Sequence, residues 1–97
     1  MDLNEVKMII DPTEVIKFNG PSDHIRTAIL KLTNDEKQDI TAKIKTTGPN
    51  FYAIKPNGIK VKTGETRVFS ISLYPGKYKL NGHKFILTVR ISKAFII

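Results

Sequence analysis

The sequence predicts an all-β fold, an immunoglobulin-like sandwich of about seven short strands. Apolar and polar residues alternate in several runs, as they do in strands with one buried face. Turn-forming residues separate these runs at short intervals, for example Asn19-Gly20-Pro21 and Asn81-Gly82. No long amphipathic helix can be drawn. Because two facing sheets bury alternate residues against each other, a sandwich is favoured over the second choice, an OB-type barrel.

Seven runs are expected to form strands, taken in chain order. They cover residues 6–10, 14–18, 26–32, 40–46, 52–55, 67–73 and 84–91. The fourth run places Ile40, Ala42 and Ile44 on one side and polar residues, including two lysines, on the other. The last run differs, because Ile86 falls on its outward side with Lys84, Thr88 and Arg90. Burial in a sheet does not explain an outward isoleucine among cations, so this side is a candidate binding surface.

Composition indicates one small globular domain spanning residues 1–97. The chain has 40% hydrophobic and 26% charged residues and no cysteine. One core is all that such a length supports. The absence of cysteine leaves no disulfide framework and fits a reducing compartment. With no apolar run of membrane-spanning length and no signal-peptide pattern at the start, we expect a cytoplasmic protein that does not insert into a membrane.

The net charge of +7 is unevenly distributed. Residues 1–39 contain five basic and eight acidic residues, a balance of −3, whereas residues 40–97 contain eleven basic residues against Glu65 alone, a balance of +10. Such asymmetry indicates an acidic partner, and nucleic acid, anionic lipid and acidic peptides all satisfy it.

Short motifs distributed along the chain resemble the major sperm protein domain, and within that superfamily the VAMP-associated proteins. The motifs are Asp11-Pro12, Lys17-Phe18-Asn19-Gly20-Pro21, Leu30-Lys31-Leu32-Thr33-Asn34, Lys43-Ile44-Lys45-Thr46-Thr47, Tyr52, Lys55-Pro56-Asn57-Gly58 and His83-Lys84-Phe85. Each motif alone is weak evidence for the resemblance, but their order and spacing together are specific. The resemblance covers nearly all 97 residues.

The resemblance implies a seven-stranded immunoglobulin-like sandwich that binds FFAT motifs, two phenylalanines in an acidic tract, and recruits partners at the endoplasmic reticulum. The implied ligand is an acidic FFAT-like peptide lying across a basic sheet face. The implied peptide-binding residues are Lys43, Lys45, Thr46, Thr47, Lys55, Asn57, Lys84 and Ile86. No cofactor is implied.

Two departures from the family pattern affect these expectations. Ile86 replaces a methionine, which exchanges a flexible side chain for a β-branched one and alters the pocket shape. After residue 91 relatives continue with a further edge strand, so here either the seventh strand is missing or its place is filled differently. The apolar end Phe95-Ile96-Ile97 would then favour self-association through an open edge. A place on the cytosolic face of the endoplasmic reticulum would require the natural chain to continue into a membrane anchor.

The physical interpretation of the site does not depend on the family. In a sandwich of this class runs 40–46 and 84–91 are neighbours in one sheet, so their outward lysines surround Ile86. The simpler interpretation is that these lysines are solvated and discourage aggregation. Thr46 and Thr47 are equally ordinary at a strand end, and Pro56-Asn57-Gly58 is foremost a turn.

Neither an enzyme nor a metal site is expected. His24 and His83 have no nucleophile or paired carboxylates at a recognisable spacing, and the chain has no zinc, calcium-loop or phosphate-loop pattern. Three hypotheses therefore remain. The first is a peptide-binding adaptor, the second is a structural protein that polymerises, and the third is non-specific nucleic-acid binding. The third is disfavoured because no aromatic stripe lies on the outward faces.

Overall fold

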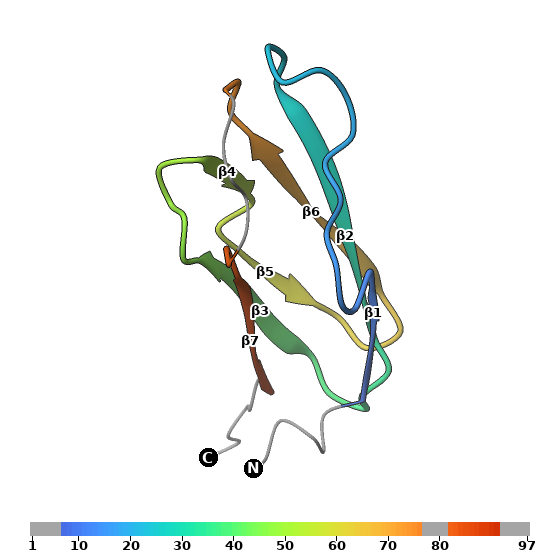
Figure 1. Cartoon of the computed structure of the whole chain (residues 1–97). Helices are drawn as coiled ribbons and strands as arrows, with labels where there is room; N and C mark the ends of the chain where they lie inside the picture. Colours follow the sequence, from blue (N-terminus) through green and yellow to red (C-terminus); the bar gives the residue numbers. More distant parts are fainter. Residues whose placement is uncertain (1–6, 77–81, 92–97) are drawn as a thin grey trace.

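The computed structural model describes residues 7–76 and 82–91, whose seven strands form two antiparallel sheets (Figure 1). One sheet has the order β1-β2-β6-β4 and contains Met8–Asp11, Arg26–Asn34, Thr66–Leu73 and Tyr52–Lys55, respectively. The other has the order β5-β3-β7 and contains Gly58–Val61, Ile40–Thr46 and Phe85–Ile91, respectively. This architecture confirms the predicted all-β sandwich. That residues 1–97 form one domain stays a prediction.

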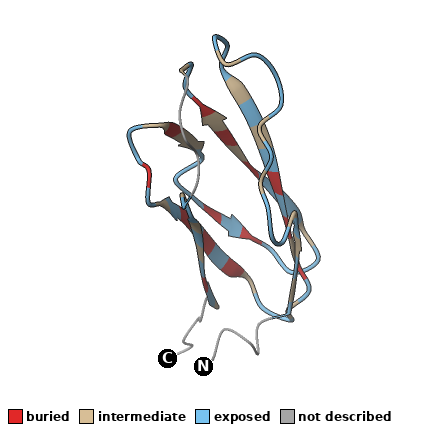
Figure 2. Cartoon of the chain, in the orientation of Figure 1, coloured by how far each residue is buried: buried red, intermediate tan, exposed pale blue. Residues whose placement is uncertain are grey.

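The core lies between the sheets and is built from alternate residues of each strand (Figure 2). Leu30 and Leu32 of β2 and Phe69 of β6 face Ile40 and Ile44 of β3. Phe69, Leu32 and Ile40 have no exposed surface. Since burying one such side chain contributes roughly 1.5–3 kcal/mol, this alternation fixes which residues remain on the outside.

A second cluster, which includes several aromatic rings, packs between the sheets around Tyr52. Tyr52 of β4 lies edge-on to Phe85 of β7, with ring centroids 4.9 Å apart, and Phe18 lies 5.5 Å from Tyr52. Phe18 belongs to the segment between β1 and β2, so this contact holds that segment against both sheets. Tilted and edge-on rings at these separations add roughly 0.5–1.5 kcal/mol to the burial of their area.

One of the predicted strands does not form, and one strand of the structure was not predicted. Residues 14–18 were expected to form a strand, and Ile16 and Phe18 do lie inward while their neighbours are exposed, yet no ladder forms. A strand requires a hydrogen-bonded partner, and none of the described strands pairs with this segment. Conversely, β5 was not predicted, because its four residues follow directly on a turn. Strands β3 and β4 have the predicted bounds, and the other four predicted strands differ by one or two residues at their ends.

The chain changes sheets between β4 and β5. Lys55, the last residue of β4, pairs with Ser70 of β6, whereas Gly58, the first residue of β5, pairs with Lys43 of β3. Only Pro56 and Asn57 lie between them. The turn motif identified in the sequence therefore serves as the crossing from one sheet to the other.

The buried side chain of Asn34 links the β2–β3 connection to β5 through hydrogen bonds. Its side-chain amide donates hydrogen bonds to the carbonyl oxygens of Gln38 and Val61, both at 2.9 Å. Its side-chain oxygen accepts a hydrogen bond from the Glu36 amide at 2.8 Å. Because the residue has no exposed surface, water cannot replace these bonds.

Replacing Asn34 by leucine should destabilise the fold by about 2–4 kcal/mol, because two carbonyl acceptors lose their partner and each loss costs about 1–3 kcal/mol. Urea unfolding followed by circular dichroism measures this change. Lys37→Ala, an exposed change in the same connection, should stay within about 0.5 kcal/mol of the original chain. Equal stability of the two variants would show that the Asn34 bonds are unimportant.

Candidate functional site

The outward face of the β5-β3-β7 sheet carries most of the predicted site residues. Lys45 lies directly opposite Ile86 in the β3–β7 ladder, and Lys43 lies opposite Thr88. The neighbour relation predicted for these two strands is thus confirmed. Opposite side chains in an antiparallel pair have Cβ atoms roughly 4.5–5.5 Å apart, so Ile86 and Lys45 are neighbours on this face. Ile86 is 53% exposed, in contrast to the buried isoleucines on the other side of the sheet.

We call this surface the basic face. It comprises the exposed outward residues Thr41, Lys43, Lys45, Lys60, Lys84, Ile86, Thr88 and Arg90. The sequence prediction omitted Arg90 as a site residue, although its place in the alternation 84, 86, 88, 90 was the signal for it. Arg90 lies opposite Thr41, at the far end of the face from Lys84.

Most of the cations on the basic face are electrostatically uncompensated. Lys60 lies 3.5 Å from the Asp39 carboxylate. In the part of the chain that the structure describes, Lys43, Lys45 and Lys84 form no ion pair. Their positive potential is therefore available to an acidic ligand.

A shallow hollow of about 500 Å³ lies across the middle of the basic face. Gly58 lies opposite Lys43 and contributes no side chain, which leaves space between Lys43 and the neighbouring strands. Lys45, Thr88 and Arg90 line the remaining sides. The hollow provides a place where a ligand group can lie between cations.

The hydroxyl groups of Thr46 and Thr47 are already engaged within the chain. Thr47 Oγ1 accepts a hydrogen bond from the Lys84 amide at 2.9 Å, and Thr46 Oγ1 accepts one from the Gly48 amide at 3.1 Å. The Thr47 amide also donates to the Lys84 carbonyl at 3.0 Å. These bonds extend the β3–β7 ladder beyond its assigned end. Each hydroxyl retains its hydrogen for donation to a ligand.

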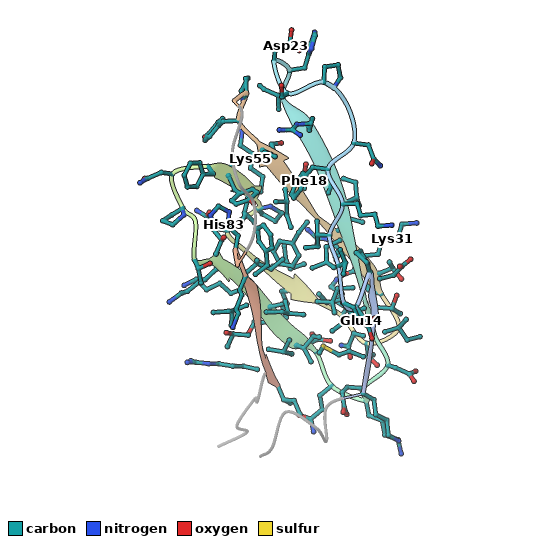
Figure 3. The ribbon with its side chains drawn as sticks, in the orientation of Figure 1. Glu14, Phe18, Asp23, Lys31, Lys55 and His83 are labelled. Atoms are coloured by element: carbon teal, nitrogen blue, oxygen red, sulfur yellow. The ribbon has the colours of Figure 1, made fainter. Side chains whose placement is uncertain are left out.

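The structure separates Lys55 from the other predicted lysines. It ends β4 in the opposite sheet and is exposed (Figure 3). Asn57 is exposed in the crossing turn, next to Gly58. Lys43, Lys45, Lys84 and Ile86 thus share one face, Thr46 and Thr47 lie at its end, and Lys55 and Asn57 lie at the corner where the chain changes sheets.

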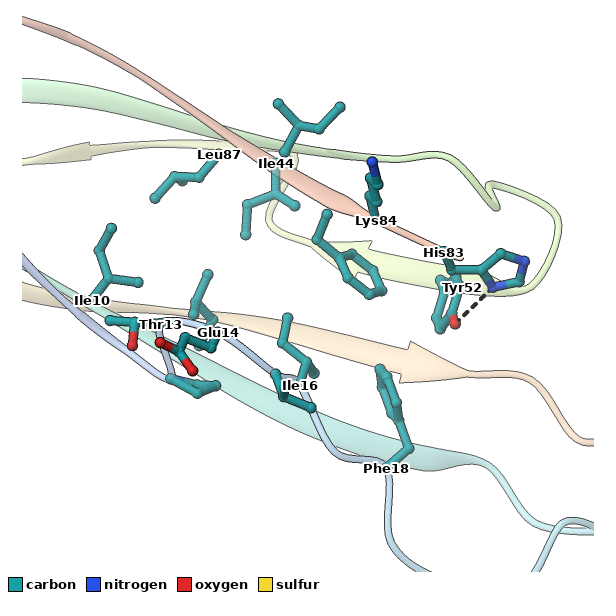
Figure 4. Close-up of a pocket in the computed structure, with 15 residues that line it drawn as sticks. Ile10, Thr13, Glu14, Ile16, Phe18, Ile44, Tyr52, His83, Lys84 and Leu87 are labelled. Atoms are coloured by element: carbon teal, nitrogen blue, oxygen red, sulfur yellow. Dashed lines mark hydrogen bonds between the residues drawn. The ribbon is translucent and has the colours of Figure 1, made fainter. Parts of the chain in front are cut away.

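His83 was not among the predicted site residues, yet it fixes the start of β7. Its Nδ1 lies 3.0 Å from the Tyr52 hydroxyl (Figure 4). Its ring stacks on Phe51 at 5.1 Å between centroids. A Cβ atom on Gly48 would lie only 3.1 Å from the same ring. A side chain at Gly48 would crowd this ring, so glycine favours the close approach of His83, the residue next to Lys84.

Burial raises the pKa of Tyr52 above its ordinary value, and the positive charge of Arg26 opposes this shift only in part. The hydroxyl consequently keeps its proton at neutral pH, where it can pair with either tautomer of His83. Because the pKa in the folded state is raised, the stability from burying the neutral phenol is present below the unfolded pKa and decreases at higher pH.

Other kinds of site find no support in residues 7–76 and 82–91. Asp23 and His24 lie 2.9 Å apart, but both are largely exposed. Within these ranges, no three histidine, aspartate or glutamate side chains gather as a metal site would need. Nor do these residues form a helix with the length and apolarity of a membrane span.

Comparisons with known proteins identify the family and agree with the fold. The family model described as the MSP (major sperm protein) domain matches residues 7–94. Vesicle-associated membrane protein-associated protein A of Homo sapiens is 34% identical over 90 residues, which are 90% of this chain and 36% of that protein. Vesicle-associated membrane protein-associated protein B of Rattus norvegicus is 33% identical over 86 residues, which are 86% of this chain and 35% of that protein.

The matching region is thus about a third of the length of these relatives. A solved structure titled "Structure of WR4, a C.elegans MSP family member" aligns with a TM-score of 0.71 at 18% identity, covering 93% of this chain and 77% of that chain. At this identity the likeness shows the fold alone. The family model and the relatives together show that the chain belongs to the major sperm protein domain family and is homologous to the VAMP-associated proteins.

Proposed function

We propose that this chain is a non-enzymatic interaction module that binds short acidic, FFAT-like peptides across its basic face. The proposal depends mainly on the place of Ile86 in the pairing of β3 with β7. Ile86 is an exposed apolar residue directly opposite Lys45, on the same face as Lys43 and Lys84. An apolar contact surrounded by unpaired cations matches an aromatic side chain within an acidic tract.

The cations and the apolar residue have different tasks in this interaction. Charges separated by more than about 8 Å are largely screened at physiological salt, so the lysines mainly attract and orient the peptide. Burial of Ile86 against a phenylalanine of the ligand slows its dissociation. A short peptide held by these two contributions should bind with a Kd near the micromolar range, about −8 kcal/mol.

The corner residues complete the proposed site. Asn57 and the hydroxyls of Thr46 and Thr47 provide hydrogen bonds to the peptide backbone, and Lys55 meets acidic residues that extend past the edge of the sheet. Recruitment of partners to the cytosolic face of the endoplasmic reticulum belongs to the same proposal, for a polypeptide in which this domain is joined to a membrane anchor.

Reversing the charge of Lys45 tests the electrostatic part. Lys45→Glu should weaken binding of an acidic peptide containing two phenylalanines by about tenfold, or ~1.4 kcal/mol, and calorimetry measures the change. Raising the salt concentration should reduce this difference, because the lost contacts are exposed. Lys31→Glu makes the same charge change on the outer face of the other sheet and should leave the affinity within about twofold. Equal weakening by both variants would indicate attraction by net charge alone.

Replacing Ile86 tests the apolar contact. Ile86→Asp should lower the affinity by about 10- to 100-fold, because burial of such a side chain contributes roughly 1.5–3 kcal/mol. The melting temperature should stay nearly unchanged, since the side chain is half exposed in the free chain. Ile29→Asp, at an outward position that is 47% exposed in the other sheet, is the matched control. Unaltered affinity of the Ile86 variant would refute the proposed site.

A further inference from the structure

The turn that carries the chain from β4 to β5 contains the dipeptide Asn57-Gly58 (Figure 1). Both residues are exposed. Within the described part of the chain, the Asn57 side chain forms no hydrogen bond. Because glycine has no side chain, its main-chain nitrogen can approach the preceding side chain more closely than that of any other residue. The turn is therefore a candidate site of a reaction between these two groups.

The main-chain amide of Gly58 points away from β3. In the ladder with β7, the Thr47 amide donates to the Lys84 carbonyl at 3.0 Å, so Thr47 faces β7. Main-chain direction alternates along an antiparallel strand, so Lys43, which lies an even number of residues earlier, also faces β7. Gly58 lies opposite Lys43 and forms with it a pair without main-chain hydrogen bonds.

The next residue of the same alternation supports this direction. The carbonyl of Lys60 accepts a hydrogen bond from the Arg67 side chain at 3.4 Å, so its main-chain groups also face away from β3. Among the described strands, β5 pairs with β3 alone. The Gly58 amide thus has no hydrogen-bond acceptor in residues 7–76 and 82–91. An exposed, unpaired amide exchanges its proton with solvent far more readily than an amide bonded within a ladder.

The turn does not require glycine at position 58. Other glycines adopt a positive φ, for example Gly20 at 121° and Gly82 at 86°, whereas Gly58 does not. A Cβ atom on Gly58 would lie 3.5 Å from the Ala42 carbonyl oxygen, an ordinary van der Waals distance. Gly58→Ala should therefore fold normally, and its methyl group would hinder the approach of the amide nitrogen to Asn57.

Positive charge surrounds the dipeptide. Lys43 lies opposite Gly58 on the basic face, and Lys55 precedes the turn. Both lysines are exposed, and in the described part of the chain neither forms an ion pair. Their positive potential stabilises a deprotonated Gly58 amide. It also stabilises the negative charge that develops on the Asn57 side-chain oxygen when this amide attacks.

We propose that Asn57-Gly58 is a site of spontaneous deamidation. Hydroxide removes the proton of the Gly58 amide, and the nitrogen forms a bond to the side-chain carbonyl carbon of Asn57. The bond from this carbon to the side-chain nitrogen breaks. That nitrogen takes a proton from water, which regenerates hydroxide, and leaves as ammonia. Water then opens the resulting succinimide ring at either carbonyl, which gives aspartate or isoaspartate, so the net change is uptake of water and release of ammonia.

Both products alter the basic face. Each places a carboxylate at the corner where Asn57 lies, beside cations that the proposed function assigns to an acidic ligand. Isoaspartate also routes the main chain through the former side chain and lengthens the turn by a methylene carbon. Since the turn spans only two residues between the Lys55–Ser70 and Lys43–Gly58 pairs, the longer main chain disturbs the start of β5. Acidic peptides should then bind less tightly, an expectation that, unlike the modification itself, rests on the proposed function.

Incubation of the intact, folded chain in neutral and mildly alkaline buffer tests the modification. Peptide mapping by mass spectrometry locates the exchange of NH2 for OH, and labelling by protein isoaspartyl methyltransferase measures isoaspartate. Product should accumulate at residue 57, and faster at higher pH, because more of the amide is deprotonated. Gly58→Ala should slow this reaction by at least about tenfold, or ~1.4 kcal/mol of activation free energy. Circular dichroism verifies that the variant remains folded.

Two comparisons make the mapping specific. Asn-Gly also occurs at residues 19–20 and 81–82, and Asn57→Gln should remove the product at residue 57 alone. Absence of product at residue 57 in the folded chain, under conditions in which the chain unfolded in urea reacts, would overturn the proposal. Equal rates for the original chain and Gly58→Ala would overturn it as well, because the unhindered glycine amide would then have no part in the reaction.

Calorimetry separates this proposal from the proposed function. Asn57→Asp should bind the acidic peptide with two phenylalanines about two- to fivefold more weakly, the effect of an exposed charge. Asn19→Asp makes the same charge change in the β1–β2 connection and should leave the affinity unchanged. Equal affinities of the two variants would overturn the expected effect on binding. Complete absence of peptide binding would refute the proposed function, whereas the mapping of residue 57 would still decide the modification.

Discussion

The antiparallel pairing of β3 with β7 is the interaction on which the candidate site of this molecule depends. In the observed register Lys45 lies opposite Ile86, and the apolar residues of both strands face the core. A shift of one residue would exchange the two sides of β7, exposing Phe85 and Leu87 and burying Lys84. Burial of the core residues opposes this shift, so the same packing that stabilises the sandwich also keeps the cations outside.

Contacts at one end of the β3–β7 pair reinforce this register. Thr47 exchanges two hydrogen bonds with Lys84, and His83 is held by Tyr52 and by stacking on Phe51. Tyr52 belongs to β4 in the other sheet, so His83 connects the two layers at the point where β7 begins. These contacts hold the main chain of Lys84 in place, although its side chain is exposed.

The alternation of apolar and polar residues was sufficient to predict the sandwich, the core face and the outward position of Ile86. The alternation was insufficient where the presence of a neighbouring strand decides whether a segment joins a sheet. The run at 14–18 has the side-chain pattern of a strand but has no described neighbour to pair with, whereas Gly58–Val61 becomes β5 because β3 offers it an edge. The alternation also does not reveal that the chain changes sheets at Pro56 and Asn57; Lys55, which the family resemblance grouped with the other lysines, ends the strand before this crossing.

The pleat of β7 divides its residues between two surfaces. Lys84, Ile86, Thr88 and Arg90 turn their side chains to the basic face and their main chain to β3. Phe85, Leu87 and Val89 turn their side chains to the core. The side chains of the basic face and the side chains of the core therefore come from different residues of one strand. The basic face can vary in sequence without removing the core contacts of β7 or its main-chain hydrogen bonds to β3.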